Sequence, residues 1–141
     1  MANILIVDNY LSIGLLYREV LHDEGHKVLV AKSGKTAYLL ALCERVDIAV
    51  VDDALIDYRA EELFGKLKQC QPNIRGILII SSTFGPKGNT LLWDEVVFKS
   101  GNYRILQEKI KRVSQDCEPD IPSSQKKVRD AFKTASVIQV G

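Results

Sequence analysis

The chain has 141 residues, which fits one compact domain with a short extension. Its content of 46% hydrophobic and 26% charged residues is that of an ordinary globular protein, and it contains no apolar run of the roughly 20 residues that a membrane span needs. The formal net charge of +1 argues against nucleic acid as a partner, and the N-terminus lacks the basic segment of a signal peptide, so we expect a cytoplasmic protein.

Five short apolar runs rich in Ile, Val and Leu alternate along the chain with longer segments of helical period. The runs comprise residues 3–7, 27–31, 47–51, 76–80 and 95–98. Most of them lack polar alternation, which indicates strands that are buried on both faces. The alternation of strands and helices predicts an α/β fold in which helices cover both faces of a parallel sheet.

The segments between these runs predict helices with one apolar side. The first helix has a stripe of Leu11, Leu15, Leu16, Val20 and Leu21, and the last has Ile105, Leu106, Ile110 and Val113. We expect both stripes to be buried, with Gly25 ending the first helix. A second helix over 36–46 with Ser33 as its cap and a third over 59–70 are also predicted.

The segment 82–94 contains two glycines and a proline near its start. We therefore expect a loop or a shortened helix there.

Four polar residues stand where apolar runs stop: Asp8, Asp52, Ser81 and Lys99. The carboxyl ends of parallel strands are where ligands bind, so we expect these side chains to converge on one crevice. A carboxylate nucleophile, a hydroxyl group and a cation together suit phosphoryl transfer.

Two nearby features are predicted to lie outside this crevice. Asp53 follows Asp52 directly, and because adjacent side chains of a strand point apart we expect its carboxylate to be solvated. His22 and His26 are spaced like a pair of metal ligands, but Gly25 separates them, which favours exposed histidines at a helix end.

The motifs around these residues resemble the receiver domains of response regulators in two-component signalling, over residues 1 to about 116. ILIVDN resembles the family's first strand, DIAVVDD its third, ILIISS its fourth, and VVFKS the strand that carries its lysine. The resemblance implies a flavodoxin-like, doubly wound sheet of five parallel strands in the order 2-1-3-4-5, with a shortened fourth helix and a C-terminal extension. We divide the chain into a receiver domain, 1–117, and a linker with a short amphipathic helix, 118–141.

The resemblance also implies a function. Asp52 would accept a phosphoryl group from a histidine kinase or a phosphotransfer protein, assisted by Ser81 and Lys99. Mg²⁺ would be held by Asp8, Asn9, Asp52 and the backbone carbonyl of Ala54, and weakly, because Asn9 stands in place of an acid. The output would be altered contact with a downstream protein or within a homodimer, and the only reactions would be self-phosphorylation and autodephosphorylation.

Departures from the family pattern leave two alternatives open. Asn9, Val96 in place of an aromatic residue, and Ser100 in place of a proline suit a degenerate receiver that acts as an interaction module without phosphorylation. The second alternative is an aspartate-nucleophile phosphatase, which would carry another Asp where Ala54 stands.

Overall fold

The computed structural model describes residues 1–81, 85–86, 88–99 and 103–116. Its strands are β1 (Asn3–Val7), β2 (Lys27–Ala31), β3 (Ile48–Asp52), β4 (Arg75–Ile80) and β5 (Glu95–Phe98). Its helices are α1 (Leu11–Asp23), α2 (Gly34–Cys43), α3 (Ala60–Cys70) and α4 (Tyr103–Asp116), with a 3-10 turn η1 (Thr90–Leu92) between β4 and β5. The predicted segment 118–141 and Ser100 lie outside the described residues.

The strands form one sheet in the order β2-β1-β3-β4-β5, and every neighbouring pair is parallel. This confirms the expected α/β fold and its strand order. Strand β3 runs one residue further than predicted, because Asp52 still pairs with Ile79 in the ladder. The candidate nucleophile is therefore the last residue of a central strand.

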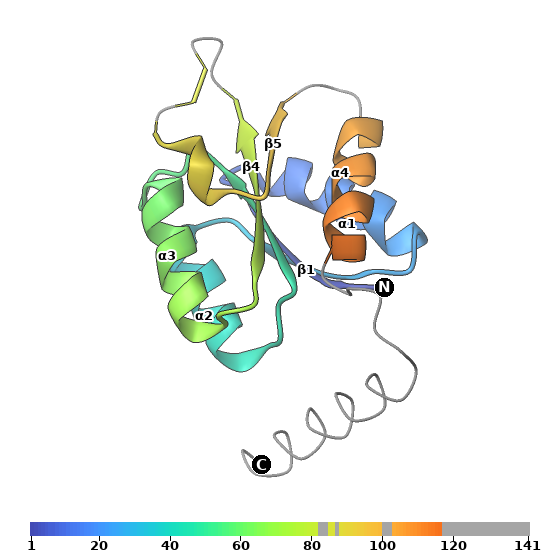
Figure 1. The fold of residues 1–141 in the computed structure, drawn as a ribbon, viewed down its shortest axis with the longest axis horizontal. Helices are drawn as coiled ribbons and strands as arrows, with labels where there is room; N and C mark the ends of the chain where they lie inside the picture. The colour runs from blue at the N-terminus through green and yellow to red at the C-terminus, as the bar shows by residue number, and fades with distance from the viewer. Residues whose placement is uncertain (82–84, 87, 100–102, 117–141) are drawn as a thin grey trace.

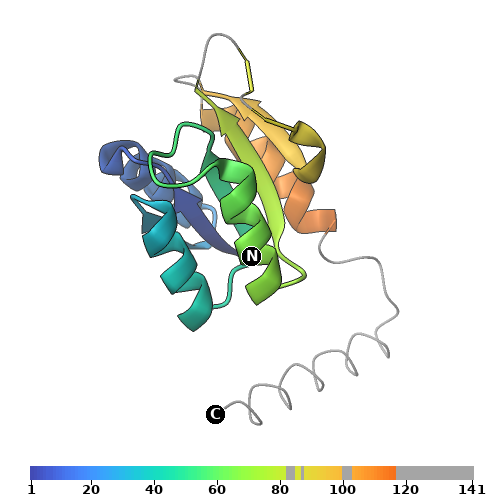
Figure 2. The ribbon, with the colours of Figure 1, turned by 90° about the vertical axis from the view of Figure 1, so that its left-hand side faces the viewer.

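Two helices cover each face of the sheet, α2 and α3 on one and α1 and α4 on the other (Figure 1). Figure 2 shows α2 and α3 side by side in front of the sheet. Each face has its own apolar cluster; on the α2 and α3 side, Phe64 stacks on Trp93 with ring centroids 4.5 Å apart. Strand β3 is buried along its whole length, as the unbroken apolar run predicts.

Helix α1 fully buries only one residue of the predicted stripe, Leu21. Its buried residues are Gly14, Tyr17 and Leu21, whereas Leu11, Leu15 and Leu16 are exposed. A Cβ atom at Gly14 would lie 2.6 Å from Cγ1 of Val30, so the glycine lets the helix lie close to β2. In α4 the stripe residues Leu106, Ile110 and Val113 are buried as predicted, and Ile105 is exposed.

The end of α1 explains a second difference. Gly25 has a φ of +92° and donates its N–H to the His22 carbonyl, while His26 donates its N–H to the Leu21 carbonyl, which is a Schellman motif. This turn buries His26, whose Nδ1 accepts the Ala2 N–H at 3.0 Å. The prediction that both histidines are exposed was wrong for His26.

The other helix predictions agree more closely with the structure. The Ser33 hydroxyl accepts the Thr36 N–H at 3.1 Å and caps α2, which ends at Cys43, before the predicted residue 46. Among the described residues between β4 and β5 the only helical element is the turn η1, as the glycines and proline predict. No helix in the described residues is long and apolar enough to cross a membrane.

Candidate functional site

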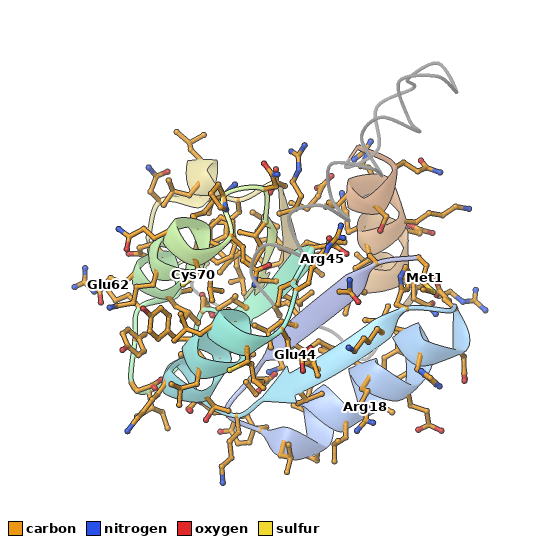
Figure 3. All side chains as sticks on the ribbon, turned by 90° about the horizontal axis from the view of Figure 1, so that it is seen from below. Met1, Arg18, Glu44, Arg45, Glu62 and Cys70 are labelled. Carbon is orange, nitrogen blue, oxygen red and sulfur yellow. The ribbon has the colours of Figure 1, made fainter. Side chains whose placement is uncertain are left out.

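The candidate site lies at the edge of the sheet where the parallel strands end, at the top of Figure 1. Asp8 follows β1, Asp52 ends β3, Ser81 follows β4 and Lys99 follows β5. Backbone hydrogen bonds hold these ends: the Asp8 N–H donates to Ala31 at 3.0 Å and the Lys99 N–H donates to Ile80 at 2.8 Å. Met1, Glu44, Arg45 and Cys70, labelled in Figure 3, lie at the opposite edge, where strands begin.

The Lys99 ammonium group joins the two buried acids. Its Nζ donates to Asp52 Oδ2 at 2.6 Å and to Asp8 Oδ2 at 3.0 Å. Asp8 is 1% exposed and Asp52 is 3% exposed, so water screens neither charge well. One cation therefore compensates two carboxylates, and the cluster keeps a net negative charge.

The other oxygen of Asp52 is held by neutral donors. Oδ1 accepts the Ala54 N–H at 2.8 Å and the Ser81 hydroxyl at 3.1 Å. Both oxygens of Asp52 thus have fixed directions, one towards Lys99 and the other towards Ser81. A fixed carboxylate with a cation and a hydroxyl group beside it can attack an electrophile that carries negative oxygens.

Burial and charge shift the pKa values of two groups here in the same direction. Burial raises the pKa of Asp8 above its ordinary value, and the nearby Asp52 charge adds to this, although hydrogen bonds from Tyr10 and Lys99 oppose it. Burial alone would lower the pKa of Lys99, but its hydrogen bonds to Asp52 and Asp8 outweigh burial and raise it. Lys99 therefore stays protonated at neutral pH.

The oxygen atoms here suit Mg²⁺, which prefers carboxylate and carbonyl ligands. Asp8 and Asp52 already direct an oxygen each at one cation, the Lys99 ammonium group. Asn9 and Ala54 are also in place, but the Asn9 Nδ2 donates to the Ala54 carbonyl at 2.6 Å. The amide thus turns its Nδ2, and not the Oδ1 that could bind a metal ion, towards the Ala54 carbonyl. Within the described parts of the chain, no group of three His, Cys, Asp or Glu side chains is arranged for a metal ion.

Asp53 belongs to the site, although the sequence predicted a solvated side chain. It is 7% exposed, and its Oδ1 accepts both the N–H and the hydroxyl of Ser81 at 3.1 Å. Asp53 follows the last residue of β3, and both carboxylates reach the Ser81 hydroxyl; the strand is central, and helices cover both of its faces. The unbroken apolar run before Asp53 was the signal that both faces are buried.

A pocket of about 550 Å³ opens beside the site, between the segment that follows β3 and the residues before η1. Asp53 and Leu78 line it from the sheet, and Tyr58, Glu61 and Asn89 from its sides. Asp53 is the acid at the carboxyl edge of the sheet that this pocket reaches.

Comparison with known proteins gives one curated relative. Over 82 residues the chain is 32% identical to sporulation initiation phosphotransferase F of Bacillus subtilis, which covers 58% of this chain and 64% of that protein. The match spans less than two thirds of the relative's length. No family model matches the chain.

Solved structures extend the likeness over the fold. Response regulator TrrA of Thermotoga maritima, in complex with Mg²⁺ and BeF, has a TM-score of 0.72 and 26% identity over 80% of this chain and 99% of that chain. A CheY-like receiver domain protein of Methanospirillum hungatei has a TM-score of 0.76 and 25% identity over 83% and 96%. TrrA has also been solved in complex with the histidine kinase ThkA.

The sheet order, the acids and lysine at its carboxyl edge and these likenesses agree on one assignment. The chain is similar to response-regulator receiver domains in its fold and in the acids and lysine at this edge of the sheet.

Proposed function

We propose that Asp52 accepts a phosphoryl group and that the phosphorylated form is the signalling state of the chain. The observation that carries this proposal is the contact of Lys99 with both Asp52 and Asp8, at 2.6 and 3.0 Å. It supplies a positive charge beside the oxygen atoms that would receive the phosphoryl group. Such charge stabilises a transition state in which negative charge spreads over the phosphoryl oxygens.

In the proposed reaction a carboxylate oxygen of Asp52 attacks phosphorus. The bond between phosphorus and the donor's leaving atom breaks, and its electron pair stays on the donor. Lys99 would pair with one phosphoryl oxygen, and the Ser81 hydroxyl would donate to another. The product is an acyl phosphate on Asp52, and its hydrolysis restores the carboxylate.

The donor we propose is a histidine kinase or a phosphotransfer protein. Two findings support this choice: the likeness to a protein named as a phosphotransferase, and the complex of TrrA with a histidine kinase. The output would be changed contact with a downstream protein or with a second copy of the chain. We propose no turnover of external substrates, because the site supplies a nucleophile that is itself modified.

Mg²⁺ would be held by Asp8, Asn9, Asp52 and the Ala54 carbonyl. When bound, it would neutralise charge on the transferring phosphoryl group. The residues limit its affinity, because Asn9 brings no charge and its amide is already bonded to Ala54 at 2.6 Å. We therefore propose weak binding.

The test is to mix the protein with an acyl phosphate and Mg²⁺ and to measure its intact mass. The expected result is one added phosphoryl group, which is lost in Asp52→Asn. Asp47→Asn is the matched control, because Asp47 precedes β3 at the opposite edge of the sheet. An unmodified wild-type protein, or an adduct that persists in Asp52→Asn, would contradict the proposal.

A second candidate is an interaction module that works without phosphorylation. Two observations favour it: Asn9 is hydrogen-bonded to the Ala54 carbonyl, and Lys99 is paired with both acids. The polar groups of the site thus already have partners within the protein. The same mass measurement separates the two, since this candidate predicts no adduct.

The phosphatase alternative lacks such support. Ala54 stands where its acid would be, and it contributes a backbone N–H to Asp52 rather than a proton donor for a leaving group.

A further inference from the structure

We propose that Asp53 is a positioning residue of the phosphoryl-transfer site, which competes with Asp52 for the single hydroxyl proton of Ser81. A phosphoryl group on Asp52 must then take this hydroxyl group away from Asp53. The inference rests on the proposed function and adds to it a second buried carboxylate that opposes phosphorylation.

The distances around Ser81 carry the first step. Its hydroxyl oxygen lies 3.1 Å from Asp52 Oδ1 and 3.1 Å from Asp53 Oδ1. A serine hydroxyl has one proton, so it donates to only one of these oxygens at a time. Two carboxylates at equal distance therefore share one donor.

The backbone fixes Asp53 in this position. Its N–H donates to the Ile79 carbonyl at 2.9 Å, and its Oδ1 accepts the Ser81 N–H at 3.1 Å. Hydrogen bonding between the two chain segments thus continues past Asp52 and Ile79, the last paired residues of β3 and β4 on this side, through the Asp53 carboxylate. The Asp53 side chain cannot turn away without breaking its hydrogen bond with the Ser81 N–H. The backbone therefore keeps this carboxylate beside the Ser81 hydroxyl group.

Charge gives the competition its direction. Lys99 is bonded to Asp8 and Asp52, and no ion pair within the described residues neutralises Asp53. Asp53 Oδ2 is buried and has no hydrogen-bond partner there either. A phosphoryl group that reaches Ser81 would meet this carboxylate, which no cation of the described residues neutralises, and like charges at short range repel strongly in a buried site. Asp53 should therefore disfavour the phosphorylated form.

The experiment is a double-mutant cycle of Asp53→Asn and Ser81→Ala. The initial rate of adduct formation from an acyl phosphate with Mg²⁺ is measured by intact mass. Asp53→Asn should raise this rate about tenfold, the factor that separates a hydrogen bond to a charged acceptor from one to a neutral acceptor. In the Ser81→Ala background the same change should raise the rate clearly less, because the shared donor is gone and only the charge repulsion remains.

A merely structural carboxylate would not show this coupling to Ser81. Equal rates for wild type and Asp53→Asn, or the same rise in the Ser81→Ala background, would overturn the inference. Asp57→Asn is the matched control, because this carboxylate accepts the Gly34 and Lys35 N–H groups and has no bond to Ser81. Its rate should equal that of wild type.

Failure of the inference can be told apart from failure of the proposed function. An adduct in the wild type with no effect of Asp53→Asn overturns only the inference. An adduct that appears only in Asp53→Asn supports the inference and overturns phosphorylation of the natural chain, and no adduct in either protein overturns both. Thermal unfolding shows which variants fold, and Asp53→Ala repeats the comparison without an amide group. Loss of folding in both Asp53 variants would assign this residue a structural role and overturn the inference.

Discussion

At the scale of single residues, the main feature of the site is an excess of buried acids over the positive charges that neutralise them. Asp8, Asp52 and Asp53 are all buried, and only Lys99 is bonded to any of them as a cation within the described residues. Asn9 reduces the negative charge by one where the family pattern has an acid. The amide eases repulsion in the metal-free protein, but it would bring no charge to the proposed Mg²⁺ site.

Asn9→Asp should therefore bind Mg²⁺ at least about tenfold more tightly, since an added charge near a dication is worth more than 1 kcal/mol at the edge of a protein. Calorimetric titration with Mg²⁺ measures the affinity. Without Mg²⁺ the same variant should unfold at a lower temperature, because it loses the bond to the Ala54 carbonyl and adds a like charge beside Asp8. Unchanged affinity would show that Asn9 does not face the metal.

The sequence allowed the grouping of Asp8, Asp52, Ser81 and Lys99 to be expected, because each follows an apolar run and parallel strands end at one edge. It did not allow the place of Asp53 to be predicted. Alternation of side chains says which face of a strand a residue occupies, whereas the packing of the whole sheet decides whether that face is buried.

At the scale of elements, the strands and α3 could be predicted, but the buried face of α1 could not. Leucine is the usual core residue, and three leucines of α1 nevertheless face outward, because Gly14 and Tyr17 fit the surface of β2 and the neighbouring strands. The predicted stripe ignored glycine, whose small size lets a helix approach a sheet closely. Helical period alone did not distinguish these two faces.

Two glycines on neighbouring elements give a matched test of packing around α3. A Cβ atom at Gly76 of β4 would lie 2.5 Å from the Phe64 ring, whereas at Gly65 of α3 nothing lies within 4 Å. Gly76→Ala should lower the free energy of unfolding by about 1–3 kcal/mol, since Phe64 is held by its stack on Trp93. Gly65→Ala should raise it by about 1 kcal/mol, the difference in helix propensity. Chemical denaturation measures both, and equal effects would contradict this packing.

At the scale of the whole molecule, one hydrogen bond ties the start of the chain to the end of α1. His26 Nδ1 accepts the Ala2 N–H, and a protonated imidazole has no free acceptor there. Burial lowers the pKa of His26 below its ordinary value of 6.5, and the charge of the N-terminus adds to this effect. The sequence could not predict it, because Ala2 and His26 become neighbours only when β1 and β2 pair.

The pH dependence of global unfolding tests this contact. The unfolded chain takes up a proton at His26 near pH 6.5, while the folded protein resists it until a lower pH. The stabilising effect is thus present above pH 6.5 and is lost as the pH falls, with a slope of at most about 1.4 kcal/mol per pH unit. His26→Asn, whose Oδ1 can replace Nδ1 as acceptor, should flatten this slope, and the exposed control His22→Asn should not. The same slope in His26→Asn and wild type would assign it to other groups.

The contact of Lys99 with Asp8 joins residues 91 positions apart. During synthesis the ribosome releases the chain from its N-terminus, so the acids of β1 and β3 emerge well before the lysine that follows β5. A nascent chain halted before residue 99 carries the nucleophile without its counter-ion. The proposed transfer of a phosphoryl group to Asp52 would therefore require that residue 99 has been translated.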